Sequence, residues 1–130
     1  MSHFTYMKTR FQNLFYLGKA LNQLNIDYSL EQNQVMTGAK TYTMKNIVIP
    51  QSNGYHITFD WNGQEYELVA DLSFWQQSYP IKSFIDKIAQ HYASEVVIGE
   101  SQKIGFRPVS YEKNSDGSNT LVLERWNISN

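Results

Sequence analysis

The chain has 130 residues, a size typical of one domain, and 42% of them are hydrophobic, which is enough to build a buried core. Its 11 basic and 12 acidic residues give a formal net charge of -1, which disfavours nucleic-acid binding, and the absence of cysteine excludes disulfides, thiolate metal sites and thiol nucleophiles. No stretch is apolar for long enough to span a membrane. We therefore expect a single soluble domain over residues 1–130.

The first predicted element is a helix over residues 8–24. Its apolar residues recur at steps of three and four, which places them on one side of a helix; they are Phe11, Leu14, Leu17, Leu21 and Leu24. Asn25 is suited to the position that ends the helix. Residues 27–30 then form a short extended stretch, and the polar residues 31–40 are expected to form a connection.

Strands are predicted next. Residues 41–49 are rich in Thr, Tyr, Ile and Val, and Pro50 ends this strand because it has no N–H for a ladder hydrogen bond. A second strand follows, in which four apolar residues alternate with polar ones and should face inward: Tyr55, Ile57, Phe59 and Trp61.

The dipeptide Asn62-Gly63 favours a two-residue type I′ turn, which would fold the chain back into a hairpin. This turn would place Trp61 opposite Gln64 and Phe59 opposite Tyr66. The opposite face of the hairpin is polar and acidic, and we expect it to face water. It carries His56, Thr58, Asp60, Glu65, Glu67 and Val69.

The second helix is predicted to follow Pro80 and to extend over residues 81–97. Gly99 disfavours a continuation to Lys103, and Gly105 is suited to the end of the helix. Two strand-like runs, residues 107–112 and 120–126, then predict a last hairpin that turns at Asp116-Gly117. This order of elements predicts an α+β fold: a mostly antiparallel sheet with two helices packed on one face.

No linear motif for catalysis, phosphate binding or a cofactor is present, so we expect no cofactor and no metal. The three histidines, His3, His56 and His91, lack metal-binding spacing. Asp60 and Glu65 would face each other across the hairpin, and with His56 they could serve an enzyme or a small-ligand protein. A solvated sheet face is the interpretation that we favour over this alternative.

Aromatic residues of the segment 72–79 are the strongest candidates for a contact with a partner protein: Phe74, Trp75 and Tyr79. The alternative is that Trp75 closes the core beneath the second helix. Nucleic-acid binding is a less favoured interpretation, because it would require six dispersed basic residues to gather on one surface. They are Lys40, Lys45, Lys82, Lys87, Lys103 and Arg107.

Three parts of the chain resemble one family: the opening Met1-Ser2-His3-Phe4, the block from Trp61 to Leu72 with Trp75-Gln76-Gln77 after it, and the closing Glu124-Arg125-Trp126. It is the hypothetical chloroplast reading frame family number thirty-five, found in plastid genomes and cyanobacteria. The resemblance implies a location in the plastid stroma, or in the cytoplasm if the source is cyanobacterial. It implies no reaction and no site residues. The missing catalytic motifs, the nearly neutral charge and the aromatic segment 72–79 lead us to expect a non-catalytic binding or assembly module whose partner is another stromal protein.

Overall fold

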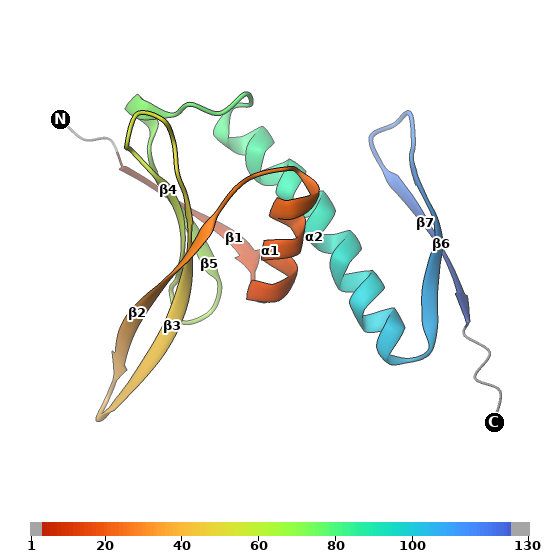
Figure 1. Cartoon of the computed structure of the whole chain (residues 1–130), viewed down its shortest axis with the longest axis horizontal. Helices are drawn as coiled ribbons and strands as arrows, with labels where there is room; N and C mark the ends of the chain where they lie inside the picture. The colour runs from red at the N-terminus through yellow and green to blue at the C-terminus, as the bar shows by residue number, and fades with distance from the viewer. Residues whose placement is uncertain (1–3, 126–130) are drawn as a thin grey trace.

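A computed structural model of the chain describes residues 4–125 (Figure 1). In chain order its elements are β1 (Phe4–Phe11), α1 (Leu14–Gln23), β2 (Ser29–Thr37), β3 (Lys40–Ile49), β4 (Ile57–Trp61), β5 (Tyr66–Asp71), the short 3-10 helix η1 (Leu72–Phe74), α2 (Ile81–Lys103), β6 (Phe106–Lys113) and β7 (Asn119–Arg125). Five strands form an antiparallel sheet in the order β1-β5-β4-β3-β2, and β6 pairs with β7 in a separate two-stranded sheet. The predicted α+β class is confirmed.

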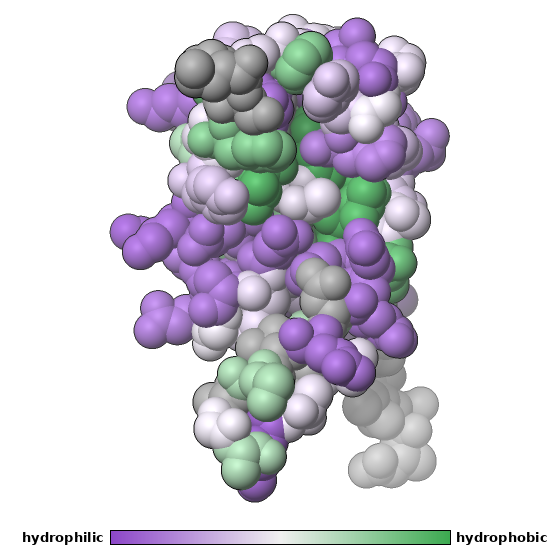
Figure 2. Space-filling view, turned by 90° about the vertical axis from the view of Figure 1, so that its left-hand side faces the viewer, coloured by the Kyte–Doolittle hydropathy of each residue, from purple (hydrophilic) through white to green (hydrophobic). Residues whose placement is uncertain are grey.

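The molecule is arranged in layers. Both helices lie on one side of the five-stranded sheet and contact each other, and the β6–β7 hairpin lies on the far side of α2 (Figure 1). The other face of the sheet, which we call the outer face, points away from the helices and is seen in Figure 2. The sheet therefore has one face packed on the core and one face without a covering helix from residues 4–125.

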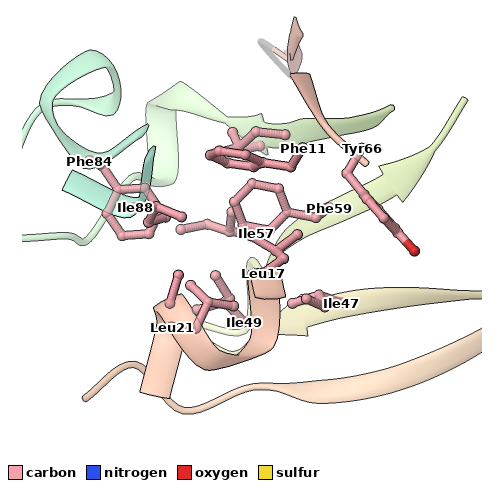
Figure 3. Packing of buried hydrophobic residues seen from close by; sticks show 13 residues of the cluster. Phe11, Leu17, Leu21, Ile47, Ile49, Ile57, Phe59, Tyr66, Phe84 and Ile88 are labelled. Atoms are coloured by element: carbon pink, nitrogen blue, oxygen red, sulfur yellow. The ribbon is translucent and has the colours of Figure 1, made fainter. Parts of the chain in front are cut away.

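The core lies between the helices and the inner face of the sheet. Leu17 and Leu21 of α1 point toward Ile47 and Ile49 of β3, while the Phe11 and Phe59 rings pack at a centroid distance of 6.2 Å (Figure 3). The largest fully buried side chains are Phe59, Leu17, Leu21, Ile47, Ile57, Leu68 and Ile88. Burying one such side chain contributes about 1.5–3 kcal/mol, so this cluster is the main source of stability.

The start of the predicted first helix is wrong, because residues 8–11 belong to strand β1. This strand pairs with β5, with Met7 opposite Leu68, and continues through a bulge before Phe11. Helix α1 begins only at Leu14, where the Asn13 side chain accepts a hydrogen bond from the Tyr16 N–H at 3.1 Å. An N-cap of this kind fixes a helix start. The predicted end is confirmed, since Asn25 adopts a positive φ of 57° just after the C-cap.

The connection predicted over residues 31–40 is also wrong, because most of it is strand β2. This strand pairs with β3 along its whole length, from Ser29 opposite Val48 to Thr37 opposite Lys40. It is the edge of the sheet, and its far end extends beyond the helices (Figure 1). Polar residues are therefore compatible with both of its sides, and an apolar alternation is not required.

The hairpin between β4 and β5 is confirmed, but its predicted register is wrong by two residues. Trp61 pairs with Tyr66 and Phe59 with Leu68, which leaves a four-residue loop over residues 62–65. The Asn62 Oδ1 atom accepts the N–H groups of Gln64 and Glu65, both at 2.9 Å, so the side chain stabilises the wider loop. A shift of two residues keeps every side chain on its expected face.

Helix α2 continues through Gly99 to Lys103, and Gly105 follows it with a φ of 92°. The structure explains Gly99, because a Cβ atom there would overlap the Tyr16 ring of α1. Gly18 of α1 has the same role against the Tyr28 hydroxyl. Two glycines therefore allow the close approach of α1 to its neighbours.

The predicted final hairpin is confirmed as β6 and β7. It does not join the main sheet, and the predicted strand residue Trp126 lies outside the described residues.

Candidate partner-binding surface

Two connections meet at one end of the five-stranded sheet: residues 50–56, between β3 and β4, and residues 72–80, between β5 and α2. Four of their apolar side chains are 37–47% exposed. We call them the loop surface; they are Tyr55, Leu72, Phe74 and Tyr79. Two of the three predicted contact residues, Phe74 and Tyr79, belong to this surface.

Gln51 joins the two connections through both ends of its amide group. Its Nε2 atom donates to the Tyr55 carbonyl at 2.5 Å and to the Phe74 carbonyl at 3.1 Å. Its Oε1 atom accepts from the Gln76 backbone N–H at 2.8 Å and from the Gln77 side chain at 3.1 Å. A single side chain therefore satisfies backbone groups that have no strand partner.

Neighbouring side chains add to this network. The Asn53 Nδ2 atom donates to the Phe74 carbonyl at 2.9 Å, and its Oδ1 atom accepts the Tyr55 N–H at 2.9 Å. Asp71 caps the short helix η1, accepting the Ser73 N–H at 3.0 Å. Hydrogen bonds therefore hold both connections in one arrangement.

The most prominent feature of the loop surface is a stack of two exposed rings. The Tyr55 and Phe74 rings are parallel within 3°, with centroids 3.7 Å apart, although Tyr55 is 47% and Phe74 37% exposed. The prediction that Tyr55 faces inward is wrong, because β4 begins only at Ile57. The backbone of Tyr55 is held instead by Gln51 and Asn53.

The third predicted contact residue, Trp75, is half-buried beneath α2. Its ring meets Phe84 edge-on at 5.2 Å, and its Nε1 atom donates to the Tyr79 carbonyl at 2.8 Å. This is the position that the core-closing alternative predicts. Tyr79 itself is 46% exposed, and the Lys87 Nζ atom lies 4.5 Å from its ring centroid. Tyr79 and Lys87 line a small pocket of ≈ 220 Å³ together with Leu24, Ile26, Ser78 and Phe84.

The carboxylates of the predicted acid-base pair do not face each other. Asp60 pairs with Glu67, whereas Glu65 lies in the four-residue loop. His56 is exposed before β4, where its Nδ1 atom accepts the Gln51 N–H at 3.4 Å. Burial raises the pKa of Asp60, a hydrogen bond from Thr58 opposes this shift, and the charges of Glu31 and Glu67 add to it.

Within residues 4–125, no group of three or more histidine and carboxylate side chains could hold a metal ion. Two of the basic residues considered for nucleic-acid binding lie at opposite ends of α2. Lys82 and Lys103 are separated by 21 positions of one helix, or about 32 Å at 1.5 Å per residue. Lys103 pairs with Glu100, and Arg107 with Glu124.

Comparison with known proteins places the chain in a family. A family model described as "Protein of unknown function (DUF1257)" matches residues 20–122. "Uncharacterized protein ycf35" of Trieres chinensis is 59% identical over 124 residues, which cover 95% of this chain and 97% of that protein. The proteins of the same name from Guillardia theta and Pyropia yezoensis are 42% and 38% identical, over 97% and 98% of this chain and 98% and 99% of their own lengths. The chain belongs to the Ycf35 family.

Membership of the Ycf35 family confirms the resemblance carried by the block from Trp61 to Leu72. No solved structure matches the chain. Among the helices between residues 4 and 125, none is both long and apolar enough to cross a bilayer. Sequence reasoning identified Phe74 and Tyr79 but missed Gln51 and Tyr55. The polar, turn-forming residues after Pro50 gave no signal that they would support an aromatic stack.

Proposed function

We propose that this Ycf35-family chain is a non-catalytic binding or assembly module of the plastid stroma, and that it binds another stromal protein through the loop surface. The observation that supports this proposal most directly is the exposed Tyr55–Phe74 stack on a hydrogen-bonded backbone. The name of the relatives, ycf35, supports the plastid location, because it is the name of a chloroplast reading frame.

Exposed aromatic rings are common anchors of protein interfaces, where they bury a large apolar area with few rotatable bonds. The hydrogen bonds of Gln51 and Asn53 fix the backbone of both rings before any partner arrives. A partner that binds here therefore loses less affinity to the ordering of loops than it would at a flexible segment. An aromatic stack in this setting favours a binding role.

Affinity capture from a plastid extract tests the proposal. The bait is the full-length chain, compared with a Tyr55→Ala, Phe74→Ala variant and with Phe15→Ala, a matched control that removes a 65% exposed ring on α1. We expect the double variant to lose at least about tenfold of the captured partner, and the control to retain it. Cross-links from the partner should map to residues 50–56 and 72–80.

Circular dichroism and thermal unfolding establish that each bait is folded. Capture that is the same for the wild type and for the folded double variant would contradict the loop surface as the binding site. A specific turnover of a small molecule by the purified chain would contradict the non-catalytic role.

A further inference from the structure

The outer face of the five-stranded sheet carries a largely apolar row that crosses four strands, with Thr58 as its polar member. The pairings Tyr6↔Val69, Val69↔Thr58 and Thr58↔Val48 place these side chains next to one another on β1, β5, β4 and β3. Tyr6 is 66% exposed, and Phe4, two residues before it on β1, is 59% exposed. Figure 2 shows most of the hydrophobic side chains of this face in its upper half, above a mostly hydrophilic middle, and a smaller group at its lower tip.

A second row, rich in carboxylates, runs beside the apolar one. Lys8 pairs with Glu67, Glu67 with Asp60, and Glu31 lies farther along on the edge strand β2. The row thus contains three carboxylates and one cation. The two ion pairs seen between residues 4 and 125, Lys103–Glu100 and Arg107–Glu124, both lie elsewhere.

The carboxylates of this row affect one another. Partial burial and the charges of Glu31 and Glu67 raise the pKa of Asp60, so its ionisation is less favourable here than that of a carboxyl group in water. A cationic side chain placed over Asp60 would relieve this repulsion. Charge complementarity on this face therefore favours a basic partner.

The spacing of the rows fits a helix. Strands lie about 4.8 Å apart, so the row from Tyr6 to Val48 spans about 14 Å, or about three helical turns. Residues two positions apart on a strand are separated by about 7 Å, which places the carboxylate row within reach of Lys or Arg side chains at the border of an apolar stripe.

We propose that the outer face binds an amphipathic helix of a partner protein, with its apolar stripe on the row from Tyr6 to Val48 and its Lys or Arg side chains on Glu31, Asp60 and Glu67. A second copy of this chain fits less well, because face-to-face association would bring carboxylates against carboxylates. Nucleic acid and anionic lipid are disfavoured by the same charge. This inference uses other residues than the loop surface and does not depend on it.

Two synthetic 18-residue helical peptides serve as probes, one with a leucine stripe bordered by lysine and a matched one bordered by glutamate. Both are titrated into the isotopically labelled full chain and followed by NMR. We expect the Leu/Lys peptide to bind and to shift the signals of Val48, Thr58 and Val69, and the Leu/Glu peptide to bind at least about tenfold more weakly. Affinity for the Leu/Lys peptide should fall as salt is added.

Variants separate the outer face from the overall charge. Replacing its carboxylates (Glu31→Gln, Asp60→Asn, Glu67→Gln) should weaken binding of the Leu/Lys peptide at least about tenfold. The matched control neutralises three exposed carboxylates elsewhere (Asp86→Asn, Glu100→Gln, Glu112→Gln) and should change affinity less than about twofold. Val48→Thr with Val69→Thr should also weaken binding while leaving its salt dependence unchanged.

Four results would overturn the proposal: no binding of the Leu/Lys peptide, equal binding of both peptides, equal loss of affinity in both neutralised variants, or shifts confined to α1 or to the loop surface. Loss of the plastid partner on Tyr55→Ala, Phe74→Ala tests the other surface, so either proposal can fail while the other stands. Sedimentation of the free chain as a dimer that the Val48→Thr, Val69→Thr variant abolishes would show that a second copy occupies the face instead.

Discussion

The five-stranded sheet with its helices and the β6–β7 hairpin differ in how they are stabilised. We call the five-stranded sheet and its two helices the body. Among residues 4–125, the largest fully buried side chains belong to β3, β4, β5, α1 and the first half of α2. In the hairpin, which we call the arm, Val109 is 50% and Val122 45% exposed. A pocket of ≈ 340 Å³ lies between the arm and α2, lined by Val97 and Leu121 among others.

The body and the arm both contain antiparallel strands, but different forces stabilise them. The body is held by apolar burial, so its stability is sensitive to volume and shape. The arm is held by strand pairing and by exposed polar contacts such as Arg107 with Glu124. Isolated two-stranded hairpins are marginally stable, so the arm should open more readily than the body.

The largest expected effect is the loss of a core ring. Phe59→Ala removes a fully buried side chain from the centre of the body and should lower the free energy of unfolding by about 3–5 kcal/mol. Val122→Ala in the arm should change it by less than about 0.5 kcal/mol. Chemical denaturation measures both. Similar losses for the two variants would mean that the arm is part of the cooperative core.

A smaller effect should follow from the contact of Gly18 with Tyr28. Gly18→Ala places a methyl group against the Tyr28 hydroxyl and should cost about 1–3 kcal/mol, less the roughly 1 kcal/mol by which alanine favours a helix. In Gly18→Ala, Tyr28→Phe the hydroxyl is absent, and most of the loss should be recovered. Additive effects in this double-mutant cycle would rule out the contact as the cause.

In the arm, the pair of Arg107 and Glu124 should contribute less. The Arg107 Nε atom donates to Glu124 Oε1 at 2.7 Å, but both side chains are exposed, so the pair should be worth about 0.2–1 kcal/mol. A double-mutant cycle with Arg107→Ala and Glu124→Ala measures this coupling. In either single variant, amide exchange in β6 and β7 should become faster while exchange in β4 is unchanged. Faster exchange in β4 as well would show that the arm and the body unfold together.

The smallest expected effect is a pH-dependent gain from Asp60→Asn. The pKa of Asp60 is raised in the folded chain, mainly by burial and further by Glu31 and Glu67, so its ionisation opposes folding as the pH rises from 3.8 through the folded pKa. After solvent screening, Asp60→Asn should stabilise the body by less than about 0.5 kcal/mol at pH 7 and by nothing below pH 3.8. If Asp60→Asn is still more stable than the wild type in acid, packing rather than charge causes the effect.

Much of the body and the arm could be predicted, because local signals agreed with burial. Pro50 and Gly105 mark the ends of elements, and the alternation from Ile57 to Trp61 marks an inward face. The edge strands β1 and β2 were missed for a physical reason. An edge strand can expose both sides, so its pairing depends on the backbone of a neighbour distant in sequence rather than on its own pattern.

The candidate site was only partly predictable. Phe74 and Tyr79 stood out as aromatics on a connection, but the stack requires Tyr55, 19 positions earlier than Phe74. The hydrogen bonds of Gln51 reach residues up to 26 positions away, as with Gln77. Single-sequence patterns describe local periodicity, and they contain no information on which distant carbonyl an amide will meet.

The amide of Gln51 also creates a mechanical linkage. The segment to which it hydrogen-bonds, residues 74–77, lies shortly before α2, while Gln51 itself follows β3 of the sheet. A displacement of the first turn of α2 must therefore either move the Tyr55 ring as well or break the hydrogen bonds of Gln51 to residues 74–77. A displacement of residues 72–80 would therefore be transmitted to residues 50–56, so the geometry of the Tyr55–Phe74 stack depends on the position of α2.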